Sequence, residues 1–364
     1  MLFHEKMTYS GFPTIVFLCG SKYSKNNPSE KRNILKKYIE EKHKFCKAII
    51  LEENFFFSST NLNYCSYDDV YLYNLEQVEQ LASIFADKVI IIHETISTGA
   101  ELGMFASSLN NPSKICLLVP ENLSVDENKV TGFIQLAFFN KKMQYDTIKK
   151  IIFYPDVQIK RFSNEKSHYF TFFHNNSIGE HLGAAIDRFI ISNSSANEII
   201  QFKKIRFNPS SKNKHIEYIA NHKKKRLYVF VSSEALKIQL CSLLSQKSIM
   251  TKLRSSKTIK EHVGVLCKKY RQTLKDTICE LEGLNSTNFT QYISLKEYDC
   301  KIDQVVGYFL YMLQGASLID LVAPDKNNPA LRKVIIKNDF TQIIKQSANL
   351  IYEKKESVFE RRFR

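Results

Sequence analysis

The run His93–Gly103 (HETISTGAELG) carries the residues in the first half of the chain that are best suited to chemistry. It follows a short apolar segment and precedes a helical pattern. Small residues there predict a turn that lets a ligand approach the backbone closely; they are Ser97, Thr98, Gly99 and Ala100. Free N–H groups at a helix start favour a phosphate or a similar anion. Glu101 is expected in the first turn of this helix, beside that anion.

A carboxylate in such a crevice suits attack on the anomeric carbon of a sugar. Glycosidic cleavage through a retained intermediate needs a carboxylate nucleophile and a second carboxylate as acid/base. Glu101 is the expected nucleophile, and Glu76 and Asp87 are candidates for support. The alternative is structural, because the helix dipole favours an acid in a first turn without any catalysis. Glu76 and Asp87 would then be ordinary helix-end residues.

Alternating apolar runs and helical patterns must position these residues. Strands are expected at Thr14–Cys19, Ala48–Leu51, Lys88–His93, Ile115–Val119 and Ile151–Tyr154. Continuously apolar strands joined by helices predict an α/β fold with a flavodoxin- or Rossmann-like parallel sheet. Ligands of such folds bind at the carboxyl ends of the strands. Cys19, Gly20 and Ser21 are therefore expected to bind substrate, together with Ser97, Thr98 and Gly99.

Three runs resemble the nucleoside 2-deoxyribosyltransferase family, and more narrowly the deoxyribosyltransferase-like effector proteins of bacterial retrons. They are IVFLCGS (15–21), NLEQVEQLASIFADKVIII (74–92) and STGAELGMFASSLNNPSKICLL (97–118). The resemblance covers about residues 13–155. It implies that Glu101 is the nucleophile, that Asp87 matches the acid before the apolar strand and that Glu76 replaces the acid on the preceding helix. Gly20 matches the glycine of the first strand.

The resemblance implies a toxin that cleaves the N-glycosidic bond of a nucleotide, with NAD the expected substrate, in anti-phage abortive infection. A reverse transcriptase and its multicopy single-stranded DNA would hold it inactive, and a homo-oligomer is compatible with this role. No cofactor and no metal are expected, since the nucleotide enters as substrate. Two alternatives stay open: a metabolic deoxyribosyltransferase or hydrolase, and a non-catalytic regulator that binds nucleic acid.

The formal net charge of +15 lies entirely in the second half of the 364-residue chain. Residues 1–150 hold 17 basic and 17 acidic side chains, and residues 201–260 hold 15 basic and 2 acidic ones. The densest basic run is Lys223, Lys224, Lys225 and Arg226, with aromatic residues interleaved around it. This pattern suits contacts with nucleic acid or with a partner that carries it. The alternative is a solvated face of a lysine-rich module.

The length and the break in charge predict two domains. Residues 1–155 are expected to form the catalytic domain, residues 156–214 a connecting helix and linker, and residues 215–364 a basic domain that is either mainly helical or winged-helix-like. Phe202–Lys214 is assigned to the linker. Asp303–Val322 is expected to be one long apolar helix.

Composition excludes disorder over the whole length, because 44% of the residues are hydrophobic. The eight cysteines show neither C-x-x-C pairs nor zinc-ligand spacing and are expected to be reduced. No signal peptide is expected at the N-terminus. Val305–Ala323 is apolar, but its polar residues favour a buried helix over a membrane span. We therefore expect a cytoplasmic protein without membrane contact.

Overall fold

The computed structural model describes residues 3, 5–9, 12–21, 23–24, 26–54, 75–107, 114–120, 151–154, 173, 176–192, 198–210, 213–322 and 333–337. The chain divides into two compact units. The parallel-sheet unit comprises Pro13–Glu53 and Ala86–Ser194. The mixed-sheet unit comprises Met1–Phe12, Asn54–Phe85 and Ser195–Arg364. Each unit is described by itself.

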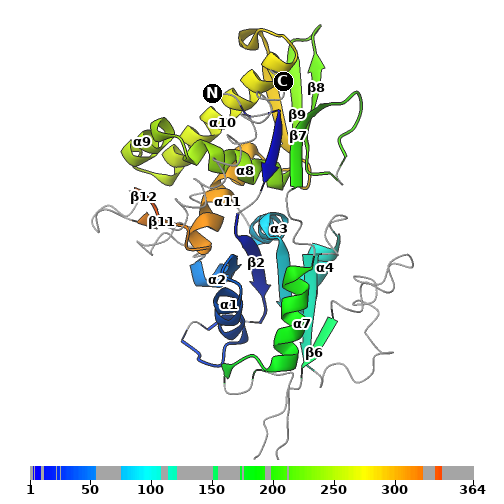
Figure 1. Ribbon diagram of the computed structural model, residues 1–364, viewed down its shortest axis with the longest axis vertical. Helices are drawn as coiled ribbons and strands as arrows, with labels where there is room; N and C mark the ends of the chain where they lie inside the picture. The colour runs from blue at the N-terminus through cyan, green and yellow to red at the C-terminus, as the bar shows by residue number, and fades with distance from the viewer. Residues whose placement is uncertain are drawn as a thin grey trace, which may run out of the picture. The chain divides into compact units, whose positions relative to one another are not determined.

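The parallel-sheet unit has five parallel strands among the described residues, in the order β3-β2-β4-β5-β6. Figure 1 labels β2 and β6 of this sheet. The bounds of the strands are β2 Thr14–Cys19, β3 Cys46–Ile49, β4 Lys88–Ile92, β5 Ile115–Pro120 and β6 Ile151–Tyr154. In chain order this is the 2-1-3-4-5 arrangement of doubly wound flavodoxin-like sheets. The expected α/β fold with a parallel sheet is confirmed.

Helices cover both faces of this sheet. Their bounds are α1 Lys31–Lys42, α2 Leu51–Asn54, α4 Ile96–Ser107 and α7 Glu180–Ile191. Leu35 of α1 and Ile186 of α7 join one buried cluster with Val16 and Leu18 of β2. Phe105 of α4 packs against Phe17, which points to the other face, with ring centroids 6.0 Å apart. β4 and β5 are buried along their whole lengths, which explains their uninterrupted apolar sequences.

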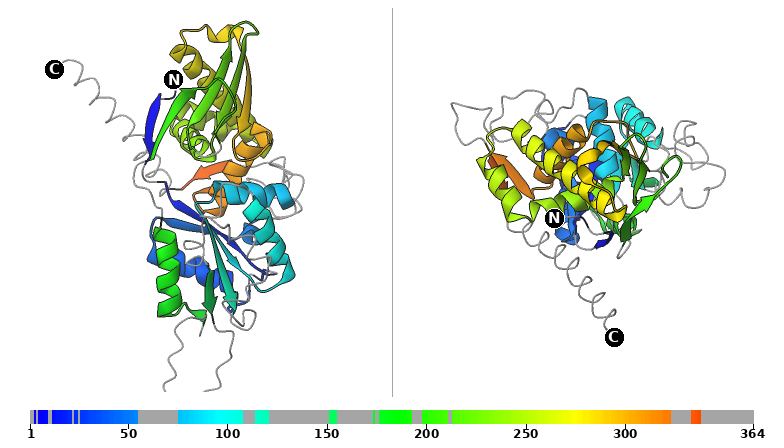
Figure 2. Two further views of the ribbon diagram at one scale, coloured as in Figure 1. Left: turned by 90° about the vertical axis from the view of Figure 1, so that its right-hand side faces the viewer. Right: turned by 90° about the horizontal axis from the view of Figure 1, so that it is seen from above.

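The mixed-sheet unit contains a five-stranded sheet in the order β1-β7-β8-β9-β10. The strands are β1 Lys6–Tyr9, β7 Glu198–Lys204, β8 Ile216–Asn221, β9 Arg226–Val231 and β10 Thr290–Leu295. The β1–β7 and β8–β9 pairs are antiparallel, while β7–β8 and β9–β10 are parallel. Among the described residues, five α-helices and a small hairpin of β11 and β12 accompany the sheet. They are α3 Leu75–Phe85, α8 Ser233–Leu244, α9 Lys247–Ser255, α10 Ile259–Leu281, α11 Ile302–Gly315, β11 Ile319–Val322 and β12 Lys333–Ile336. The left view of Figure 2 shows β7, β8 and β9 in green.

Helices α8 to α11 lie in residues 215–364, where a mainly helical domain was expected, and β8, β9 and β10 add strands of a mixed sheet to them. Two expectations for the second half are corrected. The strand β7 occupies residues that were assigned to the connecting helix and linker. The predicted helix Asp303–Val322 ends at Gly315, because Ser317 adopts a left-handed backbone with φ 56° and the chain turns into β11.

The compact units also cut across the expected linear domains. Leu75–Phe85 (α3) lies in the mixed-sheet unit, although residues 1–155 were expected to form one catalytic domain. Among the described cysteines none forms a disulfide. None of the described helices is both long enough and apolar enough to cross a membrane.

Candidate functional site

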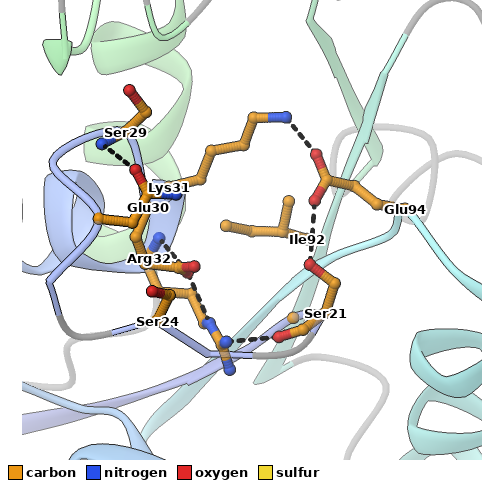
Figure 3. Close-up of a pocket in the computed structure, with 10 residues that line it drawn as sticks. Ser21, Ser24, Ser29, Glu30, Lys31, Arg32, Ile92 and Glu94 are labelled. Carbon is orange, nitrogen blue, oxygen red and sulfur yellow. Dashed lines mark hydrogen bonds and ion pairs between the residues drawn. The ribbon is translucent and has the colours of Figure 1, made fainter.

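A pocket of about 250 Å³ opens at the carboxyl ends of β2 and β4. The strand order reverses here, since β2 connects through α1 to β3 on one side and β4 through α4 to β5 on the other. Such a switch point is where doubly wound sheets bind their ligands. The lining residues are Gly20, Ser21, Ser24, Asn27, Ser29, Glu30, Lys31, Arg32, Ile92 and Glu94 (Figure 3).

Arg32 is buried beneath the pocket, with its side chain only 1% exposed. Its Nε donates to Glu30 Oε1 at 3.0 Å, its Nη1 donates to Glu52 Oε1 at 2.7 Å, and its Nη2 donates to the carbonyl oxygen of Ser21. Burial by itself lowers the pKa of Arg32, but the Glu52 and Glu30 carboxylates outweigh burial and raise it. Arg32 thereby fixes the turn after β2 to the start of α1.

Glu94 follows β4 and is the centre of a second cluster. Its Oε1 pairs with the Lys31 ammonium and accepts a hydrogen bond from Tyr154 Oη at 2.9 Å. Its Oε2 accepts from Ser21 Oγ at 3.4 Å. Tyr154 Oη also accepts from Lys31 Nζ at 3.2 Å. Figure 3 shows the Lys31 and Ser21 side chains both reaching toward Glu94.

These two clusters provide the pocket with both hydrogen-bond donors and hydrogen-bond acceptors. The Lys31 ammonium and the serine hydroxyls can donate to phosphate or sugar oxygens, and the Glu94 carboxylate can accept from sugar hydroxyls. A volume of about 250 Å³ is below the roughly 300–1,000 Å³ that is usual for whole drug-sized ligands. The pocket therefore fits a small ligand or one part of a larger one.

Glu101 lies in the second turn of α4, not in the first as expected, because the helix already begins at Ile96. Its side chain is partly buried, and its Oε2 atom is shielded from solvent. Glu101 is not among the residues that line the pocket. The helix does start directly beyond β4, so the sheet edge that carries the pocket also carries the beginning of α4.

Thr98 explains why the helix begins early. It is fully buried, its Oγ1 donates to the Thr95 carbonyl oxygen at 2.6 Å, and it accepts from the Thr95 N–H at 3.2 Å. His93 Nδ1 lies 3.1 Å from the same hydroxyl oxygen. Because the hydroxyl proton is already donated, His93 must donate from Nδ1. Burial lowers the pKa of His93, which favours its neutral form.

Gly99 does not form the predicted turn. It lies inside α4, and an added Cβ would meet His93 Cε1 at 3.6 Å, an ordinary contact. Ser97 is exposed in the first turn of the helix. Of the expected substrate-binding residues, Gly20 and Ser21 line the pocket, whereas Cys19 is buried at the end of β2.

The two expected supporting acids are not among the residues that line the pocket. Asp87 stands at the amino end of β4, where its Oδ2 accepts from the Ile15 N–H and its own N–H donates to the Ile15 carbonyl oxygen, both at 2.8 Å. It therefore ties β4 to β2 at the sheet edge opposite the pocket. Glu76 is exposed on α3 of the mixed-sheet unit. Burial of the Tyr298 phenol raises the pKa of Tyr298, and the charge of Glu76 raises it further. Asp87 is thus engaged at the end of β4 that lies away from α4, and Glu76 belongs to the other compact unit.

Sequence reasoning missed Arg32, Glu94 and Tyr154. Glu94 lies in the run His93–Gly103, but no role was assigned to it from the sequence. Its position in the sequence could have identified Glu94, since a polar residue that follows a buried parallel strand lies at the edge of the sheet where ligands bind. Arg32 shares the spacing of buried Leu35 and Ile39 on α1, a signal that its basic neighbours obscure.

Gly20 should be sensitive to a single methyl group. An added Cβ would lie 3.1 Å from both Cδ and Nε of Arg32, which is held by three partners. We expect Gly20→Ala to lower the free energy of unfolding by about 1–3 kcal/mol through this overpacking. Gly264→Ala is the matched control, because no atom lies within 4 Å of its Cβ and α10 should gain about 0.5–1 kcal/mol. Urea unfolding measures both, and equal stability of Gly20→Ala and wild type would contradict the assignment.

The basic run Lys223–Arg226 lies at the hairpin between β8 and β9, in the mixed-sheet unit. All four side chains are exposed. Within the residues that the structure describes, no group of three or more histidine, cysteine or acidic side chains is arranged to hold a metal ion.

A family profile described as STM3845 retron effector protein matches residues 28–321, more than three quarters of the chain. The matched segment includes Lys31, Arg32, Glu94 and Glu101, and it continues through the mixed sheet to β11. No curated protein matches the chain.

Proposed function

The chain belongs to the STM3845 retron effector protein family, which implies a role in anti-phage defence, and on that premise we propose that it acts as an N-glycosidase on a nucleotide, with NAD as substrate. The proposal is supported chiefly by the edge of the parallel sheet at which the strands have their carboxyl ends, since Glu94 lies in the pocket at this edge. There, the pocket at the β2/β4 switch point lies at the same edge as the start of α4, the helix of Glu101. A reverse transcriptase with its single-stranded DNA is the proposed restraint.

Glu101 is the proposed nucleophile. One of its carboxylate oxygens attacks the anomeric carbon of the ribose next to nicotinamide while the carbon–nitrogen bond breaks. The electron pair of that bond goes to the ring nitrogen, so the positively charged pyridinium leaves as neutral nicotinamide. Water then attacks the glycosyl ester, releases ADP-ribose and regenerates the carboxylate, and one proton is lost.

Glu94 is the proposed partner for the water step, in place of Asp87 and Glu76. It lies in the pocket, and it is the described carboxylate that Lys31, Tyr154 and Ser21 hold in a fixed orientation. Asp87 is engaged at the opposite edge with the backbone of Ile15. Fixed orientation supports a role in general base catalysis, which requires a group within hydrogen-bond reach of its proton.

Metabolite analysis in cells that express the full chain tests the proposal. We expect NAD to fall and nicotinamide to rise as growth stops, and the same expression together with the reverse transcriptase and its DNA should leave NAD unchanged. Growth arrest with constant NAD and constant amounts of all other nucleotides would contradict an N-glycosidase of nucleotides.

A further inference from the structure

The strands β8, β9 and β10 present one face that is not packed into the core. Along β9, Leu227, Val229 and Val231 are buried, while Arg226 is exposed and Tyr228 and Phe230 are partly exposed. This alternation separates an inner face from an outer face. The outer face is called the tyrosine face below and comprises Ile219, Arg226, Tyr228, Phe230, Thr290, Tyr292 and Ser294.

Two aromatic rings are stacked at the centre of the tyrosine face. Tyr228 and Tyr292 are register partners on the parallel strands β9 and β10. Their ring centroids lie 5.2 Å apart with an interplanar angle of 16°, and Tyr292 is 45% exposed. The pair therefore offers an exposed aromatic surface on which a planar ligand can stack.

Positive charge lies directly beside this ring pair. The Arg226 guanidinium carbon is 6.0 Å from the centroid of the Tyr292 ring. Lys223, Lys224 and Lys225 form the turn that precedes Arg226, and all three are exposed.

The basic turn is also held in place. The Lys224 N–H donates to Asn221 Oδ1 at 3.0 Å, and the Thr290 N–H donates to the Lys225 carbonyl oxygen at 2.9 Å. Lys225 takes a left-handed backbone with φ 50°, as tight hairpins require. These contacts fix the lysine turn to β10, next to the tyrosines.

The acidic residue in the described strands β8, β9 and β10 is Glu217. Glu217 is the register partner of Phe230, but its side chain is only 5% exposed and pairs with Lys296 at 3.0 Å. The charge of Glu217 is thus neutralised inside the protein, and the basic hairpin sets the sign of the surface.

We propose that the tyrosine face binds single-stranded nucleic acid. Unpaired bases stack on exposed aromatic rings regardless of sequence, and lysine and arginine beside the rings contact the phosphates. A duplex keeps its bases inside, so it could use the lysines but not the rings. This inference goes beyond the glycosidase proposal and does not depend on it.

Binding of a fluorescein-labelled oligothymidylate of about 20 nucleotides by the full chain tests the inference. Tyr292→Ser and Tyr228→Ser should each weaken binding about 5- to 100-fold, which is the usual effect of losing one stacked base. The slope of log affinity against log salt should stay unchanged in these two variants, because stacking releases no counterions. Replacing Lys223, Lys224 and Lys225 by Ser should instead lower that slope by about 2 units.

Three controls make the test specific. Tyr292→Phe retains the ring and should bind as wild type. Lys252→Ser with Arg254→Ser removes two exposed charges from α9 of the same unit and should leave the affinity for the oligonucleotide within about twofold, since single surface contacts contribute little. Circular dichroism checks that each variant is folded.

Three results would overturn the inference. The first is the absence of oligonucleotide binding by the wild type. The second is equal affinity of the tyrosine-to-serine variants and the wild type. The third is a tyrosine-to-serine variant that retains oligonucleotide binding but, unlike the wild type, no longer co-purifies with nuclease-treated reverse transcriptase. That result would make the tyrosine face a protein-docking surface.

Discussion

Glu101→Gln is expected to lower nucleotide cleavage by about a thousandfold or more while leaving the protein folded. Glutamine has the same shape as glutamate, but its amide oxygen cannot form the glycosyl ester. Steady-state release of nicotinamide from NAD measures the effect, and urea unfolding checks the fold. Growth arrest in cells should be lost to the same extent.

Asp87→Asn is the matched control for this prediction. Its side-chain oxygen can still accept from the Ile15 N–H at the far edge of the sheet, so the rate should stay within about threefold and stability should fall by no more than about 1 kcal/mol. A fully active Glu101→Gln, or equal losses of rate in both variants, would contradict the role of Glu101.

Lys296→Met is expected to destabilise the mixed-sheet unit by about 3–5 kcal/mol at neutral pH. Lys296 Nζ lies 3.0 Å from Glu217 Oε2, and the two side chains are 1% and 5% exposed. Asn213 and the Ser210 N–H also donate to this carboxylate, at 2.8 and 2.7 Å. Removing the ammonium leaves a buried carboxylate with two neutral donors, and urea unfolding measures the loss.

The pH dependence has a definite sign. Burial tends to raise the pKa of Glu217, but Asn213, Ser210 and Lys296 together lower it below its ordinary value of about 4.5. In the wild type this carboxylate therefore stabilises the fold fully above that value, and the contribution is lost as the pH falls through the lowered pKa. Lys296→Met removes the lowering by Lys296, so the pKa of Glu217 in the variant lies above that in the wild type, and the deficit should shrink as the pH falls from 7 toward 4.

Two further variants isolate the ion pair. Lys296→Met combined with Glu217→Gln removes both charges and should recover a large part of the loss. Lys252→Met, at an exposed position on α9, should change the free energy of unfolding by less than about 0.5 kcal/mol. A Lys296→Met deficit below about 1 kcal/mol, or one that grows in acid, would show that the pair is not coupled as the distances imply.

The parallel sheet could be predicted from the sequence because its central strands β2, β4 and β5 are almost wholly buried. β2 and β6 have the expected bounds, and β4 and β5 differ from them by one residue at their carboxyl ends. Continuous apolar runs carry this information locally. The position of the ligand edge then follows from the rule for parallel strands, which correctly brought Gly20 and Ser21 to the pocket.

The start of α4 could not be predicted because it depends on a side-chain contact. The glycine and small residues of the segment favour a turn, but the Thr98 hydroxyl bonds the backbone of Thr95 and lets the helix begin at Ile96. Similarly, α1 is capped by Glu30, whose carboxylate accepts from the Arg32 N–H at 3.3 Å, although glutamate is not among the residue types that usually cap helices. Both outcomes depend on competition between nearby polar groups.

The mixed sheet was missed because its pairing is non-local. β7 carries Lys203 and Lys204, which gave it the composition of a solvated linker. Its antiparallel partner is β1, near the N-terminus, and its parallel partner is β8, which follows after a loop. A strand that pairs with so distant a neighbour cannot be recognised from local sequence alone, since tertiary context decides its state.

Mass spectrometry of a trapped intermediate tests the central claim most directly. An NAD analogue with fluorine at the 2′ position of the nicotinamide ribose slows the water step, because fluorine destabilises the positive charge that develops at the anomeric carbon. After incubation with this analogue and proteolysis, the account predicts release of nicotinamide and one fluorinated ADP-ribose group on the peptide that carries Glu101. Nicotinamide release with the group on another residue, or no release from the analogue or from NAD itself, would contradict it.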